Sequence, residues 1–170
     1  MSKAFTKDDD AGEPPLVLPR RAPLPADTPN YVTSRGLLLL KTELRAQHQL
    51  RSGGALGSEA QHARENALQA GRIAELEARL ASAILVDAAL QPKDEVRFGA
   101  SVSVRNARNV TGTERRYRIV GVDEADAKSG AIAFVSPLAR SLLGKRIADV
   151  ALLTTPVGDE ELEILAISYD

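Results

Sequence analysis

The sequence predicts an α+β protein: an antiparallel coiled-coil hairpin of two α-helices, followed by an antiparallel β-sheet domain with one short helix. Apolar residues recur every three or four positions over 33–50 and over 73–84, which is the helical period. After residue 91 the period changes to two, which is typical of half-buried strands. We therefore expect three segments: a tail (1–30), the hairpin (31–90) and the sheet domain (91–170).

Composition limits the classes of function. The chain has 170 residues, 44% of them hydrophobic, and a formal net charge of -1, so its bulk charge attracts neither nucleic acid nor anionic lipid. It contains no cysteine, which excludes disulfides and thiolate metal sites. Asp8, Asp9 and Asp10 give the start the wrong polarity for a signal peptide, and no apolar run is long enough to span a bilayer. We expect a cytoplasmic protein without a membrane partner or a small-molecule substrate.

The first 30 residues hold six of the nine prolines and alternate acidic, basic and proline-rich pieces. Such a composition is typical of a disordered or extended tail. A tether is favoured over a proline-rich docking ligand, because the latter needs a partner with an aromatic groove.

Two helices are predicted between the tail and the sheet. Thr33 or Ser34 provides an N-cap for the first, whose leucines continue to Leu50. The uncharged, glycine-rich stretch 52–58 (SGGALGS) predicts a turn, after which Glu59 opens a second helix that runs to about Val86. Polar residues replace leucine in the seam near this turn, so we expect the arms to be held best at their base.

The remaining elements are strands and one short helix. Ser136 and Pro137 provide a cap and a first turn for the helix, and Gly144 ends it. Alternating or β-branched runs predict strands at 96–105, 115–122, 131–135, 150–154 and 161–169.

Residues 96–170 contain five motifs in this order: FGASVSV at 98–104, YRIVGVDEAD at 117–126, SPLARSLLGK at 136–145, TTPVG at 154–158 and the terminal LEILAISY. Together they resemble the C-terminal domain of the GreA/GreB transcript-cleavage factors. The resemblance implies an FKBP-like domain that docks on the rim of the RNA polymerase secondary channel, and a coiled coil that enters the channel.

The tip of the hairpin departs from that family. Its members carry Gly-Asp-x-Ser-Glu-Asn there, and the acidic pair is thought to help hold a second magnesium ion. Hard magnesium prefers oxygen ligands, but here only Ser58 and Glu59 match and no aspartate lies between Arg51 and Glu65. Glu59 is therefore the one candidate for a remnant metal ligand. We expect a polymerase-binding regulator that is not an enzyme, has no cofactor beyond the polymerase's own Mg²⁺, and stimulates cleavage weakly or not at all.

The resemblance also implies a docking surface in two loops. One carries Asp123, Glu124 and Asp126, which composition alone explains as a solvated acidic turn. The other carries Ser136, Pro137 and Arg140, where helix capping alone explains the first two residues.

Five arginines lie near a predicted pair of strands: Arg105, Arg108, Arg115, Arg116 and Arg118. Such a cluster could attract the phosphate backbone of RNA or DNA in the elongation complex. Acidic and basic residues are equally numerous over 96–170, however, so a strand face covered by ion pairs is favoured.

Three alternatives stay open. The protein could be a cleavage factor of the GreB type that uses Glu59, or a relative of the regulators of nucleoside diphosphate kinase, which share this C-terminal domain. A prolyl isomerase is disfavoured, because residues 96–170 offer only Phe98, Phe134, Tyr117 and Tyr169 to line the aromatic pocket that such an enzyme needs.

Overall fold

The computed structural model describes residues 23–52, 59–109, 111–156 and 158–169. Most of the predicted tail (1–22) and the predicted turn at 53–58 lie outside the described residues. Residues 23–29 contain no helix or strand, and Asn30 already belongs to the first strand, β1 (Asn30–Val32).

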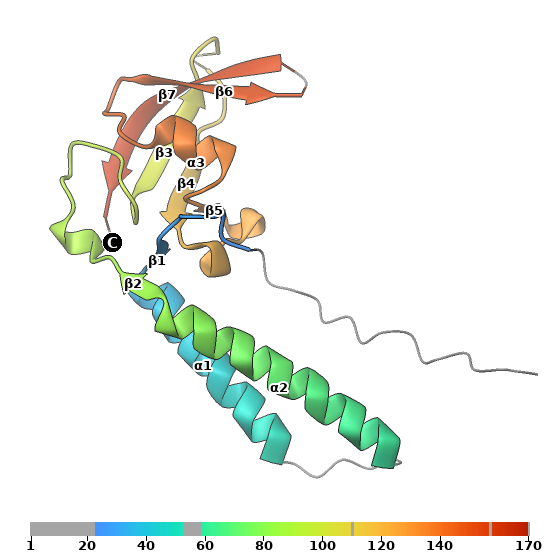
Figure 1. The fold of residues 1–170 in the computed structure, drawn as a ribbon. Helices are drawn as coiled ribbons and strands as arrows, with labels where there is room; N and C mark the ends of the chain where they lie inside the picture. The colour runs from blue at the N-terminus through green and yellow to red at the C-terminus, as the bar shows by residue number, and fades with distance from the viewer. Residues whose placement is uncertain (1–22, 53–58, 110, 157, 170) are drawn as a thin grey trace, which may run out of the picture.

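Two helices lie side by side and project as a long arm from the rest of the molecule (Figure 1). They are α1 (Ser34–Ser52) and α2 (Glu59–Ala81), which correspond to about 28 Å and 34 Å of helix. Thr33 is the N-cap of α1, because its hydroxyl accepts a hydrogen bond from Gly36 N at 2.9 Å. Two helices in contact with each other therefore lie where the sequence predicted a hairpin.

The arm is packed best where it meets the sheet. Val32, Leu40 and Leu76 form a buried cluster there, with Leu37, Leu44, Leu80 and Ala83 against it. Nearer the tip a polar contact replaces leucine packing: Gln69 donates a hydrogen bond to the backbone oxygen of Gln47 at 2.7 Å. This gradient agrees with the polar seam positions in the sequence.

The base of the arm contains two strands that were not predicted. α2 ends at Ala81 and not near Val86, because the chain becomes the strand β2 (Ala83–Leu85). β2 pairs in parallel with β1, so the segments that enter and leave the arm are joined side by side.

A five-stranded sheet makes up the other half, in the order β5-β4-β3-β7-β6. Its strands are β3 (Ser101–Asn106), β4 (Arg115–Val120), β5 (Ala131–Ala133), β6 (Val150–Thr155) and β7 (Gly158–Ser168). The helix α3 (Pro137–Leu142) contacts both edge strands, β5 and β6, so the sheet curls around it. The core between them contains Val102, Val104, Ile119, Leu142, Leu162 and Ile164.

Two expectations for the sheet are corrected. The sheet is mixed, not wholly antiparallel, because β4 and β5 run parallel. The strand expected at 96–105 begins only at Ser101, since Gly99 adopts a left-handed conformation (φ 89°) and residues 98 and 99 form a turn. Among the described residues no helix is both long and apolar enough to cross a membrane.

Candidate functional site

The acidic loop after β4 lies against the base of the arm. It forms a single 3₁₀ turn, η2 (Val122–Glu124), preceded by Gly121. A Cβ atom on Gly121 would lie 2.7 Å from the carbonyl oxygen of Tyr31 in β1. Glycine is needed there because the loop and β1 approach backbone to backbone, and this approach directs the next two carboxylates toward the helices.

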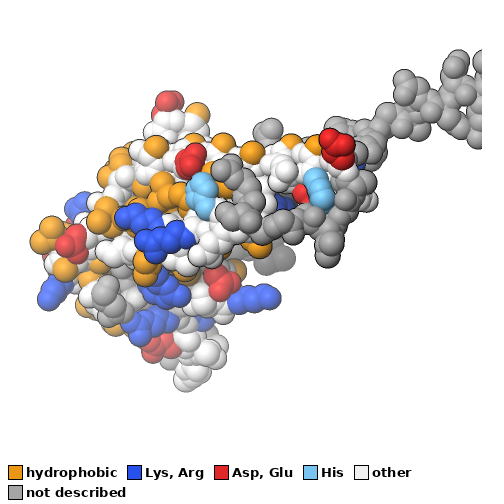
Figure 2. All heavy atoms as spheres, turned by 90° about the horizontal axis from the view of Figure 1, so that it is seen from below, with side chains coloured by type: hydrophobic (Ala, Val, Ile, Leu, Met, Phe, Trp, Pro, Cys, Tyr) orange, Lys and Arg blue, Asp and Glu red, His pale blue; other side chains and the backbone are white. Residues whose placement is uncertain are grey.

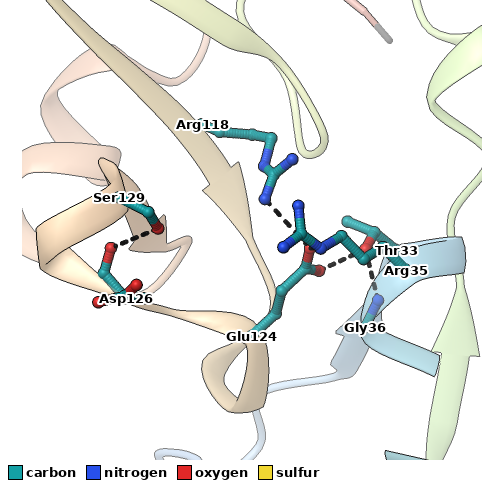
Figure 3. Close-up of polar contacts among 7 residues, drawn as sticks. All are labelled: Thr33, Arg35, Gly36, Arg118, Glu124, Asp126 and Ser129. Carbon is teal, nitrogen blue, oxygen red and sulfur yellow. Dashed lines mark hydrogen bonds and ion pairs between the residues drawn. The ribbon is translucent and has the colours of Figure 1, made fainter. Parts of the chain in front are cut away.

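Glu124 points toward the start of α1, as Figure 3 shows. Its side chain is only 3% exposed and accepts a hydrogen bond from the Thr33 hydroxyl. The other carboxylate oxygen lies 3.5 Å from a terminal nitrogen of Arg118 and 4.0 Å from Nε of Arg35. The buried charge therefore has partners from both α1 and β4, as a buried carboxylate requires.

Glu124 also supplies the negative charge that the start of α1 lacks. The first turn of α1 contains no acidic residue of its own, although a helix N-terminus favours a nearby anion. Gly36 makes room for this carboxylate, since a Cβ atom there would lie 2.8 Å from Oε2 of Glu124. Hydrogen bonds run from Gly36 N to the Thr33 hydroxyl and from that hydroxyl to Glu124.

Asp123 makes the corresponding contact with the end of α2. Its carboxylate lies 3.6 Å from Nε of Arg79, and both side chains are largely buried, with exposed fractions of 7% and 12%. Asn30 binds the same helix end, because its side-chain amide donates hydrogen bonds to the carbonyl oxygen of Arg79 at 2.9 Å and to the Ser82 hydroxyl at 3.0 Å. We call Asp123, Glu124 and their partners Thr33, Arg35, Arg79 and Arg118 the latch, because they join both helices to the sheet.

The other predicted docking residues flank the edge strand β5. Asp126 is exposed and caps a 3₁₀ turn, η3 (Ala127–Ser129), by accepting from Lys128 N at 3.1 Å. Ser136 caps α3 by accepting from Ala139 N at 3.2 Å, and Pro137 and Arg140 are exposed. The structure thus separates these four residues from Asp123 and Glu124, which face the arm.

The five arginines divide into two groups. Arg105 and Arg108 pair with Glu163 and Glu161 of β7 at 2.9 Å and 2.7 Å, and Arg115 pairs with Glu160. The hydrogen bond from Arg108 lowers the pKa of Glu161, and the one from Arg115 to Glu160 raises the arginine's own pKa. Figure 2, which views the molecule from below, shows basic and acidic side chains interspersed on that side of the surface.

Arg116 and Arg118 lie on the other face of β4. Arg118 belongs to the latch, and Arg116 donates a hydrogen bond to the Ser168 hydroxyl at 3.3 Å. The ion pairs that the sequence favoured are therefore present for three of the five arginines, although Arg115 lies on the same sheet face as Val104 and Arg105 on the opposite face. The other two arginines line a separate hollow.

Glu59 is exposed at the start of α2. Within the part of the chain that the structure describes, no three histidine or acidic side chains gather as a metal site would require. Between Arg51 and Glu65 the sequence contains one carboxylate, that of Glu59.

One feature of this region was missed in the sequence. Three aromatic rings, Tyr31, Phe98 and Phe134, lie with centroids 5.6 to 5.8 Å apart and line a cavity of about 560 Å³. Phe98 and Phe134 belong to the sheet half, whereas Tyr31 comes from β1, before the arm. The signal available was the hydrophobic Tyr31-Val32 pair directly before the helix cap.

Comparison with known proteins places the chain in a family. The model of "Transcription elongation factor, GreA/GreB, C-term" matches residues 91–169. Transcription elongation factor GreA of Yersinia pestis is 47% identical over 100 residues, which cover 58% of this chain and 62% of that protein. GreA of Methylobacterium nodulans is 35% identical over 153 residues, which cover 81% of this chain and 96% of the relative.

Solved structures give weaker matches. The GreA/GreB factor from Nitrosomonas europaea has a TM-score of 0.42 and 22% identity, with 82% of this chain and 98% of that chain covered. The GreA factor homologue Gfh1 of Thermus thermophilus has a TM-score of 0.39 and 23% identity, with 83% and 99% covered. The sequence matches, one of which extends over nearly the whole length of its relative, decide the assignment: the chain belongs to the GreA/GreB family of transcription elongation factors.

Proposed function

We propose that this protein binds RNA polymerase by inserting its helical arm into the secondary channel, while the sheet half docks on the channel rim. The proposal includes the FKBP-like arrangement of the sheet half and the domain limits 1–30, 31–90 and 91–170. The observation that carries the proposal is the latch. Two largely buried carboxylates fix the base of both helices against the sheet. An arm held in this way presents its tip at a defined distance and direction from a docking surface.

The docking contacts fall to the exposed residues beside β5. Asp126, Pro137 and Arg140 lie at the surface and offer both signs of charge to a partner. Asp123 and Glu124 are occupied by the arm, so we assign them a positioning role in polymerase binding instead of direct contact. Ser136 acts through the cap that it provides for α3.

Stimulation of transcript cleavage is weak or absent in this proposal. A second magnesium ion beside the polymerase's own needs additional negative charge, and one exposed carboxylate, Glu59, supplies about half of what an acidic pair would. Reduced charge and imprecise placement each lower the rate of a positioned reaction. The protein then acts by occupying the channel and competing with other ligands of the same site.

Site-specific photocrosslinking tests the insertion. Ala63 and Ala78 are both exposed alanines of α2, and they lie about 22 Å apart along the helix. A photocrosslinker at position 63 is expected to label polymerase residues deep in the secondary channel, whereas one at position 78 labels the rim. Equal labelling of the outer surface from both positions would exclude insertion, and no labelling of core polymerase from either would remove polymerase binding.

Stalled, backtracked elongation complexes test whether the protein stimulates transcript cleavage. Added protein is expected to leave the RNA as long as it is with polymerase alone. If the RNA is shortened and Glu59→Ala abolishes the shortening, the protein is a cleavage factor of the GreB type that completes the magnesium site with Glu59.

A further inference from the structure

The strand β6 is an edge of the sheet without the usual protection of an edge strand. Of the strands that the structure describes, β7 alone pairs with it, and the ladder between the two stays in register from Val150 to Thr155. Its sequence, VALLTT, contains no charge and no proline. Charges, proline, bulges or short length normally keep an edge strand from pairing with another chain. The opposite edge, β5, has the last of these, because it contains only three residues.

Every second residue of β6 turns its backbone away from β7. The carbonyl oxygen of Asp149, directly before the strand, accepts a hydrogen bond from Ile164 N in β7 at 2.9 Å. Backbone groups alternate in direction along an antiparallel pair, so Val150, Leu152 and Thr154 direct their N–H and C=O groups toward the open edge. The side chains of Val150 and Leu152 are apolar and lie at the surface, with exposed fractions of 45% and 56%.

We propose that β6 is a self-association surface, at which two copies of this chain pair their β6 strands antiparallel about a two-fold axis through Leu152. In this register Leu152 lies opposite its own copy, and Val150 lies opposite Thr154 of the other copy. Each backbone group that faces the open edge then has a partner, because opposed residues of this kind exchange both of their N–H···O hydrogen bonds. The two five-stranded sheets become one continuous sheet.

The charge pattern of this face makes a second copy the partner that fits. Like charges directly opposite each other destabilise a strand pair, and an uncharged strand that pairs with itself brings none together. The exposed Leu152 side chains meet at the axis and are removed from water. The acidic side chains beside them on β7, Glu161 and Glu163, are neutralised within the same chain by Arg108 and Arg105.

The surface lies apart from the core and from the arm. α3 packs against the other face of β6, where Ala151 is buried. Figure 1 shows the β6–β7 hairpin at the end of the molecule opposite the tip of the arm. Pairing through β6 therefore leaves both arms outside the contact, and the association is independent of polymerase binding.

Sedimentation velocity of the full chain tests the surface. One short strand pair belongs with the small interfaces that bury less than about 1,200 Å², so we expect a monomer–dimer equilibrium with a dissociation constant of about 100 µM. Leu152→Lys is expected to weaken it about tenfold, because two like charges meet at the axis and the apolar contact is lost. Leu39→Lys is the matched control, because Leu39 is a similarly exposed leucine on α1, and circular dichroism checks that both variants fold.

Disulfide trapping tests the register, because the chain contains no cysteine of its own. Opposed residues that exchange hydrogen bonds have Cα atoms about 5.5 Å apart, within the range of about 4.4 to 6.8 Å that a disulfide spans. With oxidised glutathione, Leu152→Cys should form a covalent dimer about tenfold faster than Leu39→Cys, whose cysteines meet only by random collision. Equal rates, a wild type that stays monomeric up to about 1 mM, or association unchanged by Leu152→Lys overturns the proposal.

Discussion

Gly36 shows how a single hydrogen atom in place of a methyl group decides the docking of the arm. Alanine in a helix is normally more stable than glycine by about 1 kcal/mol. At position 36 the added Cβ would lie 2.8 Å from Oε2 of Glu124, whose side chain is held by Thr33, Arg35 and Arg118. Gly36→Ala is therefore expected to lower the free energy of unfolding by about 1 to 2 kcal/mol, measured by urea denaturation.

A double-mutant cycle isolates the cause of that loss. In a Glu124→Ala background the obstructing carboxylate is absent, so Gly36→Ala should become neutral or stabilising, as in an ordinary helix. The same destabilisation in both backgrounds would show that the backbone of α1, and not the carboxylate, requires glycine.

Tyr169 connects the end of the chain to the start of the sheet half. Its hydroxyl donates to Glu95 O at 2.6 Å and accepts from Arg97 N at 2.9 Å, and burial raises the pKa of this phenol above its usual value near 10. The folded state thus favours the neutral form of Tyr169. The contribution of this hydroxyl to the free energy of unfolding is therefore complete at neutral pH and is lost as the pH rises through the raised pKa.

Tyr169→Phe is expected to cost about 1 kcal/mol near pH 7, because two backbone groups lose their partner. Urea denaturation from pH 7 to above about pH 10 should show the wild type and the variant converging, since only the wild type loses this contribution at high pH. A difference that stays constant with pH would contradict the assigned role of the hydroxyl.

At the scale of the elements, the arm depends on a short apolar seam at its base. Leu76 is buried and packs with Leu40 and Val32. Leu76→Ala should lower the stability of the arm by about 3 kcal/mol, seen as faster hydrogen exchange of the α1 and α2 amides. Leu39→Ala is the control, because Leu39 lies on the exposed side of α1 and the same truncation there should leave exchange unchanged.

Elements with local signals were predictable, and those defined by distant partners were not. Leucine spacing and the Thr33 cap indicated α1, and Ser136 with Pro137 indicated α3. The strands β1 and β2 each contain only three residues and pair across 53 positions of sequence, from Asn30 to Ala83. Their three-residue runs lack a period long enough to detect, and the parallel direction of β5 depends on its contact with β4.

The candidate site was predictable in its residue types but not in their orientation. A run such as Asp123 to Asp126 between a strand and a glycine is typical of a solvated turn, and that description fits Asp126. Asp123 and Glu124 face inward because Gly121 brings their loop against β1, a contact between segments 90 positions apart. The hollow lined by Arg35 and Arg118 arises from the same approach, which no local pattern in the chain encodes.

At the scale of the whole molecule, the latch sets the direction of the arm relative to the sheet. Spin labels at the exposed positions 63 and 140 report this direction through the distance between them. The wild type should give a narrow distribution. Replacing Asp123 and Glu124 together by alanine removes the carboxylates from both helix ends, so the distribution should broaden while the secondary structure content stays the same.

Asp126→Ala is the matched control for this experiment, because it removes an exposed carboxylate from the adjoining turn without touching either helix. Its distance distribution should coincide with that of the wild type. If the double variant also keeps the narrow distribution, the apolar packing of Val32, Leu40 and Leu76 fixes the arm without help from charge. A broadened distribution, by contrast, means that the helices stay intact but no longer keep a fixed orientation relative to the sheet. The affinity for polymerase should then fall, because the arm loses more orientational freedom on binding.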